Sequence, residues 1–224
     1  MNYTLIILGT ILVVIAYILY KVIDEKGRSV ASKIDLKSQE PEVRLSSVSG
    51  NPTSPRYYIS SWIYIKTLPA NKSLFKIANG NTTYLDVSMS NTASLSYEIL
   101  EDSTAATVPH TIMENFPLQK WVFLIISVDN NIVDLYIDGK LLRSHKIAGT
   151  VTQINEASSI HFGNNIDGFL AKMEREPRPI SPSEAWDKYM DGNGGNYFSK
   201  MFANYGGTVT ITKDDLDVRQ FQMF

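Results

Sequence analysis

An uncharged apolar run opens the chain and limits most strongly what it can fold into. Residues Tyr3–Tyr20 read YTLIILGTILVVIAYILY, eighteen positions without a charge, and Lys21 follows at once. At about 1.5 Å per residue the run makes a helix of about 27 Å, close to the roughly 30 Å hydrocarbon thickness of a bilayer. A buried helix of a globular domain would show a polar side, which this run lacks. We therefore expect a transmembrane anchor over residues 1–23.

The apolar and aromatic side chains of this run are the ones expected to contact lipid. Three tyrosines stand near its ends, where an interfacial aromatic belt would place them. A cleaved signal peptide is the alternative, but no basic side chain precedes the run, and its exit lacks a small-x-small cleavage site. The expected anchor residues are Tyr3, Leu5, Ile6, Ile7, Leu8, Ile11, Leu12, Val13, Val14, Ile15, Tyr17, Ile18, Leu19 and Tyr20.

Basic residues beside the run predict its orientation. None precedes it, and five follow it: Lys21, Lys26, Arg28, Lys33 and Lys37. Lys and Arg within about 15 to 20 residues of a span resist translocation, so we expect the large domain on the cytoplasmic side of a single-pass membrane protein. The sequons at Asn71 and Asn81 would then stay unmodified, because N-glycosylation takes place in the lumen.

The rest of the chain has the charge balance and the size of one ordinary domain. With 21 basic and 23 acidic residues and no basic stripe, it has little electrostatic support for nucleic-acid binding. The absence of cysteine agrees with a cytoplasmic domain without requiring one. Residues 24–56 are polar, with Ser, Pro, Glu and Asn toward their end, and are expected to form a linker.

Short runs separated by turn residues predict an all-β domain after Arg56. The run WVFLIISV at 121–128 is apolar on both faces, as in a central strand covered on each side. Turn residues at Asn79-Gly80, Asn130-Asn131 and Asp138-Gly139 predict tight hairpins. The expected strands cover residues 57–65, 74–78, 82–89, 93–100, 121–128, 132–137, 141–147, 159–162 and 168–173.

One short helix has a well-marked start. Ser181-Pro182-Ser183-Glu184 places serine at the N-cap, proline at the first helical position and glutamate three residues after the cap. The glycines at 192, 194 and 195 are expected to end it. The predicted fold is therefore mainly β, an antiparallel jelly-roll sandwich over residues 57–195 with one short helix.

Two blocks carry a resemblance to a known family. Residues 116–147 open a strand with Trp121 and continue into a Tyr-x-Asp-Gly hairpin, and residues 160–189 join a Gly-Phe strand to a proline-rich turn and a Ser-capped helix. Together they resemble the laminin-G-like, concanavalin-A-like jelly-roll family. This resemblance implies the sandwich and a binding role.

The chain departs from the catalytic members of that family, so we expect no enzyme activity. Glucan hydrolases of the family use a Glu-x-Asp-x-x-Glu strand whose alternate carboxylates face one groove, and no such strand occurs here. The nearest acidic cluster, Glu98, Glu101 and Asp102, is expected in a solvated loop. His110, His145 and His161 are scattered without the spacing of a zinc or Ser-His site.

No cofactor is predicted, although the residue types of a calcium site and of a sugar site both occur. Hard cations need several oxygens in one place, and the available ones are Asp129, Asn130, Asp138, Asn165 and Asp167. Tight turns select the same residue types for backbone reasons, which favours a turn role. Trp62, Trp121 and Trp186 could stack on sugars, but their positions on strands and on the apolar side of the helix favour core packing.

The C-terminal tail and the anchor together indicate what the chain binds. Residues 196–224 are rich in aromatic side chains and contain an alternating strand at Thr208–Thr212, so they are expected to pack on the sandwich or on a partner. This arrangement resembles membrane-anchored minor capsid proteins of large icosahedral DNA viruses. The resemblance implies a non-enzymatic protein that binds an internal virion membrane through its anchor and capsid proteins through its sandwich and tail. The alternative is a membrane-anchored carbohydrate-binding module on a cell or virion surface.

Overall fold

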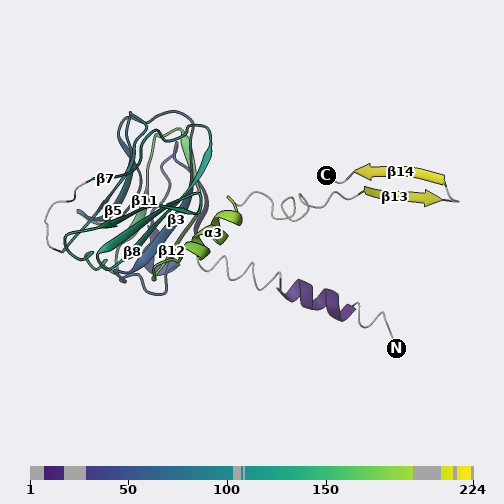
Figure 1. Ribbon diagram of the computed structural model, residues 1–224, viewed down its shortest axis with the longest axis horizontal. Helices are drawn as coiled ribbons and strands as arrows, with labels where there is room; N and C mark the ends of the chain where they lie inside the picture. The colour runs from purple at the N-terminus through teal and green to yellow at the C-terminus, as the bar shows by residue number, and fades with distance from the viewer. Residues whose placement is uncertain are drawn as a thin grey trace. The chain divides into compact units, whose positions relative to one another are not determined.

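Two six-stranded antiparallel sheets face each other in the computed structural model of the chain (Figure 1). The structure describes residues 8–17, 29–102, 107, 109–193, 208–213 and 216–222. In spatial order, sheet A contains β1 (Ser29–Asp35), β12 (Gly168–Glu176), β3 (Tyr57–Ile65), β8 (Trp121–Asp129), β9 (Ile132–Ile137) and β10 (Lys140–Lys146). Sheet B contains β2 (Val43–Arg44), β11 (Ser159–Phe162), β4 (Lys72–Asn79), β5 (Thr82–Met89), β6 (Leu95–Ile99) and β7 (His110–Met113).

One hydrophobic core fills the space between the sheets. Its fully buried side chains alternate with outward-facing ones along most strands, as in β5 and β6, whereas β8 is buried along nearly its whole length. The expected sandwich is thus confirmed, and β3, β5, β9 and β11 have the predicted bounds. Gly80 lies in the β4–β5 turn with a φ of 55°, which explains the glycine there.

The segment expected as a linker contributes strands to both sheets instead. β1 pairs with β12 at the edge of sheet A, and β2 pairs with β11 at the edge of sheet B. A four-residue helix, α2 (Leu45–Val48), follows β2. Leu36 and Leu45 are fully buried in the core, so the few apolar residues in this polar stretch are enough to hold it. The strands that pair with β1 and β2 are more than a hundred residues away, which local composition does not reveal.

A buried arginine holds the end of this segment. Arg175 is only 1% exposed, and the Cζ atom of its planar guanidinium lies 4.7 Å from the centre of the Tyr57 ring. Its two terminal nitrogens donate hydrogen bonds to the Ser49 hydroxyl at 2.9 Å and to backbone carbonyls of residues 51, 52 and 54 at 3.2–3.4 Å. One side chain therefore replaces the backbone pairing that this irregular stretch lacks.

Helix α3 (Pro182–Met190) covers part of the outer face of sheet A (Figure 1). The Ser181 hydroxyl accepts a hydrogen bond from the Glu184 amide at 3.3 Å, which confirms the predicted N-cap. Tyr189 stacks on Trp62 with ring centres 5.6 Å apart, and Trp62 stacks on Phe123 at 5.0 Å. These aromatic side chains form a second, smaller core outside the sandwich.

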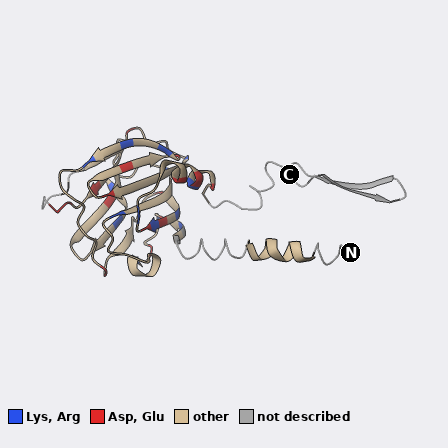
Figure 2. Ribbon diagram, turned by 60° about the horizontal axis from the view of Figure 1, so that its bottom comes forward, with Lys and Arg blue, Asp and Glu red and all other residues tan. Residues whose placement is uncertain are grey.

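Two parts of the chain are described separately from the sandwich. Residues 8–17 form a helix whose side chains are all exposed, and Figure 2 shows no charged residue along it. Within the described ranges, no helix has both the length and the apolar character needed to cross a bilayer. The expected anchor residues Tyr3, Leu5, Ile6, Ile7, Ile18, Leu19 and Tyr20, and the basic residues Lys21, Lys26 and Arg28, lie outside the described residues.

The C-terminal unit, residues 191–224, contains one antiparallel hairpin. Its strands are β13 (Thr208–Lys213), where the alternating pattern predicted a strand, and β14 (Leu216–Gln222). Their register places Val209 opposite Phe221 and Thr210 opposite Gln220. The expectation that this tail packs on the sandwich or on a partner stays a prediction.

Candidate functional site

A row of polar side chains crosses the outer face of sheet B. His161 of β11 lies opposite Lys76 of β4, Lys76 lies opposite Asp86 of β5, and Asp86 lies opposite Glu98 of β6. Directly opposite residues share one face of a sheet, and all of these are half-buried. Their sequence neighbours Ile77, Leu85 and Ile99 point into the core. The strands thus hold a rigid strip of charged groups toward solvent.

Two hollows meet at one end of this strip, on either side of His161 and Phe162. The first, of about 480 Å³, is lined by Gln39, Glu40, Pro41, Glu42, His161, Phe162 and Asn164. The second, of about 390 Å³, is lined by Asn71, Lys72, Ser73, Lys76, His161, Phe162, Gly163 and Asn164. Because the two share three residues, they form one continuous groove with acidic groups at one end and lysines at the other. We call it the His161 groove.

Hydrogen bonds fix the walls of the His161 groove. The Nδ1 atom of His161 lies 3.2 Å from Glu42, and Lys72 donates to the backbone carbonyls of residues 164 and 165 at 3.3–3.4 Å. Gly163 has no room for a side chain, since an added Cβ would lie 2.3 Å from the carbonyl oxygen of Ser73. The β11–β12 connection is therefore pressed against β4, which shapes the groove floor.

Asp86 and Glu98 form a carboxylate pair beside the groove, and the sequence pattern did not reveal it. The Ser73 hydroxyl donates to Asp86 at 2.5 Å, and the Thr107 hydroxyl donates to Glu98 at 2.7 Å. Burial raises the pKa of Asp86, the hydrogen bond from Ser73 opposes that rise, and the neighbouring charge of Glu98 adds to it. The pair comes from two strands, unlike the single catalytic strand of glucan hydrolases.

The acidic cluster predicted for a solvated loop is divided in the structure. Glu98 belongs to β6, which corrects the expected loop position. Glu101 accepts a hydrogen bond from the Gly149 amide at 3.1 Å, and Asp102 accepts one from the Thr150 hydroxyl at 3.0 Å. These two carboxylates hold a neighbouring loop, so they do not form a binding cluster with Glu98.

The residues considered for calcium are dispersed and act in turns and ion pairs. Asp129 binds Arg56 at 2.8 Å, Asp138 accepts the Phe123 amide at 2.9 Å, and Asp167 lies 3.5 Å from Lys66. Asn130 and Asn165 adopt positive φ angles of 56° and 53°, as tight turns require. No group of three or more acidic or histidine side chains suited to a metal occurs among the described residues.

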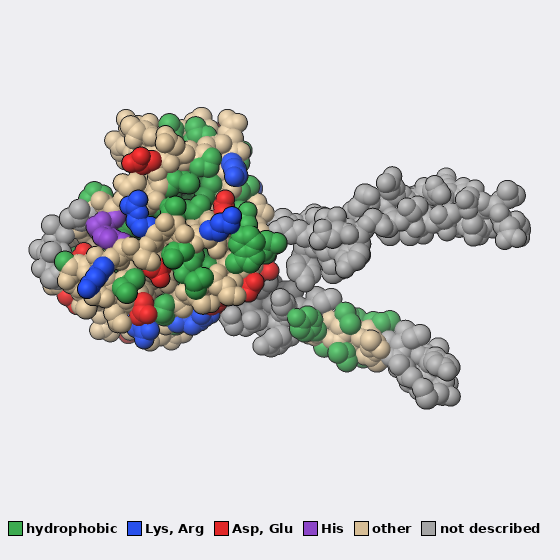
Figure 3. Space-filling model, viewed as in Figure 1, with side chains coloured by type: hydrophobic (Ala, Val, Ile, Leu, Met, Phe, Trp, Pro, Cys, Tyr) green, Lys and Arg blue, Asp and Glu red, His purple; other side chains and the backbone are tan. Residues whose placement is uncertain are grey.

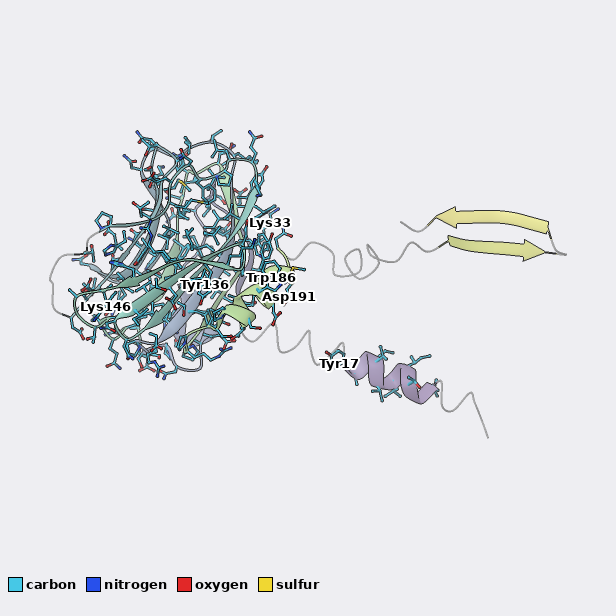
Figure 4. All side chains as sticks on the ribbon, in the orientation of Figure 1. Tyr17, Lys33, Tyr136, Lys146, Trp186 and Asp191 are labelled. Carbon is cyan, nitrogen blue, oxygen red and sulfur yellow. The ribbon has the colours of Figure 1, made fainter. Side chains whose placement is uncertain are left out.

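The three tryptophans differ in exposure. Trp62 is buried as predicted, and Trp121 is half-buried beside Tyr64, with ring centres 5.2 Å apart. Trp186 departs from the core-packing prediction, because it is 42% exposed at the surface of α3 (Figure 4). It packs against Gly139 in the β9–β10 turn, and the rest of its side chain is exposed to solvent.

Two of the histidines that appear scattered in the sequence come together. The rings of His110 and His145 have centres 4.0 Å apart, and Figure 3 shows histidine side chains gathered at one place on the sandwich surface. His161 lies apart from them, in the groove. The 34 residues between His110 and His145 hide this pair from any spacing rule.

A family model described as the concanavalin A-like lectin/glucanases superfamily matches residues 38–174. The chain belongs to this superfamily. The match confirms the laminin-G-like, concanavalin-A-like resemblance, and it includes β2 and α2 in the domain. No curated protein matches the chain.

Solved structures with the concanavalin A-like fold include toxin binding domains. The receptor binding domain of botulinum neurotoxin D is 17% identical, with a TM-score of 0.55, over 72% of this chain and 44% of that one. The binding domain of Paraclostridial Mosquitocidal Protein 1 is 18% identical, with a TM-score of 0.52, over 70% and 42%. A serotype D ligand binding domain solved in complex with N-acetylneuraminic acid is 17% identical, with a TM-score of 0.56, over 72% and 42%. The chain spans less than half the length of these structures, and the likeness shows the fold.

Proposed function

We propose that this chain is a non-enzymatic binding module held at a membrane by its N-terminal run. The observation that carries the proposal is the His161 groove, a hollow, charged surface on rigid strands of a domain whose superfamily includes binding proteins. Carboxylates near the groove are engaged by Ser73 and Thr107, which suits a fixed recognition surface. Binding rather than bond cleavage is the work that this geometry fits best.

The apolar run supplies the proposed attachment to the membrane. In the described helix, seven large apolar or aromatic side chains are 50–68% exposed, namely Leu8, Ile11, Leu12, Val13, Val14, Ile15 and Tyr17. Such a surface is stabilised by lipid rather than by water. With basic residues only on its C-terminal side, the run is proposed to leave the sandwich in the cytoplasm.

The proposed setting is the internal membrane of a large icosahedral DNA virus. There the anchor would bind the bilayer, and the sandwich and tail would bind capsid proteins, so that the chain connects membrane to shell. The supporting features are the single apolar run, the charge asymmetry around it and the grooved binding domain. The module is then a minor structural component of the virion.

A crosslinking experiment on virion membranes tests this role. A photoreactive amino acid replaces Lys76 in the groove, and a second full-length variant carries it at Thr53, which lies away from the groove. We expect a shell protein to crosslink from position 76 and not from position 53. If the protein leaves quantitatively with lipid in mild detergent and no shell protein is crosslinked, the bridging role is wrong.

Carbohydrate is the second candidate ligand for the same groove. The observation that favours it is the mixture of an aromatic ring, an amide and carboxylates around one hollow, from Phe162, Asn164, Glu40 and Glu42. Rings that stack and oxygens that accept hydrogen bonds are what sugars need. One toxin domain of the same fold was solved with N-acetylneuraminic acid, at 17% identity.

Glycan binding and topology separate the two candidates. A lectin role predicts retention of the full chain on a glycan array, with loss of retention in an Asn164→Ala variant. It also predicts a sandwich outside the cell, with glycans at Asn71 or Asn81. Digestion of the C terminus by protease added outside sealed microsomes, an unmodified mass and no retention would together remove the lectin candidate.

A further inference from the structure

The edge strands of the two sheets meet at one corner of the sandwich. β7 ends sheet B and β10 ends sheet A. His110 of β7 and His145 of β10 contact each other edge to face, with ring centres 4.0 Å apart. The hydroxyl of Tyr97, from β6, lies 2.9 Å from Nδ1 of His145. We call these three residues the His–Tyr corner.

Few other charged groups face the His–Tyr corner. Arg143 of β10 makes a long hydrogen bond of 3.5 Å to the carbonyl oxygen of Thr111 on β7. Glu101, in the bridge that follows β6, is the acidic group whose charge acts on both His110 and Tyr97. Tyr57 of β3 lies beneath Tyr97 in the core. While both imidazoles are neutral, the negative charge of Glu101 and the positive charge of Arg143 therefore balance among the described residues of this corner.

We propose that the His–Tyr corner is a pH-sensitive catch, which holds β7 against β10 while both imidazoles are neutral and opens that edge when acid protonates them. Two imidazolium rings 4.0 Å apart repel each other, and Arg143 adds a third positive charge. The bond between Tyr97 and His145 can survive by exchanging donor and acceptor, because a protonated Nδ1 donates to the phenol oxygen. The contact between the two rings includes no hydrogen bond whose donor and acceptor could exchange, so the repulsion between charged rings remains.

The sign of the effect follows from the environment of His110. Burial lowers the pKa of His110, and the neighbouring His145 lowers it further, whereas Glu101 raises it. A histidine whose folded pKa lies below its unfolded value of about 6.5 binds protons more readily after unfolding. The corner is therefore stable above about pH 6.5 and loses stability as the pH falls below that value.

The third histidine of the chain provides a matched control. The chain has three histidines, and His161 lies in the groove with its Nδ1 3.2 Å from Glu42. His161 takes no part in the contact between the rings of His110 and His145. Replacing His161 should leave the acid response of the corner unchanged.

Hydrogen exchange of the full chain in detergent micelles tests the catch. Protection factors, corrected for intrinsic exchange rates, are compared at pH 7.5 and pH 5.5. We expect protection of residues 110–113 and 143–146 to fall by about tenfold in acid, while the central β3–β8 pair keeps its protection. The response should disappear in the His110→Gln/His145→Gln variant and persist in His161→Gln.

Two results would overturn the catch. One is equal protection of these strands at both pH values, and the other is an unchanged acid response in the double variant. If the double variant fails to fold, an NMR titration of the unmodified chain gives the answer instead. The His110 ring should then titrate below pH 6.5, and titration at or above that value would contradict the proposal.

Discussion

Arg175 shows at the residue scale how one side chain can replace a missing strand. Its guanidinium sits in the interior, where burial lowers the pKa of Arg175 to about 10 against the opposing effect of the neighbouring Tyr57. The fork of Nη atoms reaches a hydroxyl and three carbonyl oxygens, which no aliphatic residue could satisfy. Arg175 thus supplies hydrogen bonds to four residues of the segment before β3.

Replacing this arginine should destabilise the domain strongly. In Arg175→Met the volume is nearly kept, but the carbonyl oxygens of residues 51, 52 and 54 lose their donors. We expect the free energy of unfolding to fall by about 3 kcal/mol, because buried polar groups without partners are costly. Urea denaturation of the full chain in detergent measures it. An exposed control, Lys146→Met, should change stability by less than about 0.5 kcal/mol.

A substitution in the carboxylate pair beside the groove should raise the free energy of unfolding rather than lower it. Burial raises the pKa of Asp86, so the folded state prefers its protonated form, and stability from this group is lost as the pH rises through its folded pKa. Asp86→Asn keeps an acceptor for Ser73 and removes repulsion from Glu98. We expect a gain of about 0.5 kcal/mol at pH 7 that vanishes in acid near pH 3. A loss of stability at pH 7 would contradict this account of the pair.

Residue contacts across strands mark the limit of prediction from the sequence. His110 and His145, or Asp86 and Glu98, meet because of strand order and register, which long-range pairing sets. The N-cap at Ser181 was predictable because it depends on residues within one turn. The His161 groove was not predictable, since its walls come from three separated parts of the chain.

At the scale of elements, α3 depends on a glycine in the turn beneath it. Gly139 has a φ of 76°, and an added Cβ would lie 2.9 Å from Cβ of Tyr189 and 3.1 Å from Cα of Trp186. The β9–β10 turn therefore requires glycine for its backbone angle and for the close approach of α3. Gly80, in the β4–β5 turn, needs glycine only for its φ of 55°, since nothing lies within 4 Å.

This difference predicts unequal effects of the same substitution. Gly80→Ala should lower the free energy of unfolding by about 1 kcal/mol, the strain of a positive φ. Gly139→Ala should lower it by about 3 kcal/mol and shift the tryptophan emission of α3, because steric overlap is added to strain. Denaturation of both full-length variants measures the contrast. Equal effects would mean that α3 can move away from the added methyl group without any further loss of unfolding free energy.

Element prediction succeeded where the signal was local. The β4–β5, β8–β9 and β9–β10 hairpins follow from alternation and turn residues, whereas β1, β2 and β7 did not stand out. β1 contains Lys33 and Asp35 and buries only Val30 and Ile34 among its described side chains, so its pattern is that of a polar linker. Distant partners make such a segment a strand, and tertiary pairing outweighs its weak propensity.

The whole molecule combines a proposed anchor with a domain that has two unlike outer faces. Sheet A carries α3 and the exposed side chains of Leu141, Leu142, Trp186 and Met190. Sheet B carries the charged strip and the His161 groove. A module tethered to a membrane can use one face for ligand while the other remains for packing, which is the arrangement that a connecting role needs.

Membrane extraction of the full chain tests the central claim most directly. Membranes from cells that express the chain are washed with alkaline carbonate and floated on a density gradient, beside an Ile11→Lys/Ile15→Lys variant and an Ile11→Leu/Ile15→Leu control. We expect the unmodified chain and the leucine control to float with lipid. The lysine variant should stay at the bottom, because each central lysine costs about 3 kcal/mol of insertion. Release of the unmodified chain into the soluble fraction would contradict a membrane-held binding module.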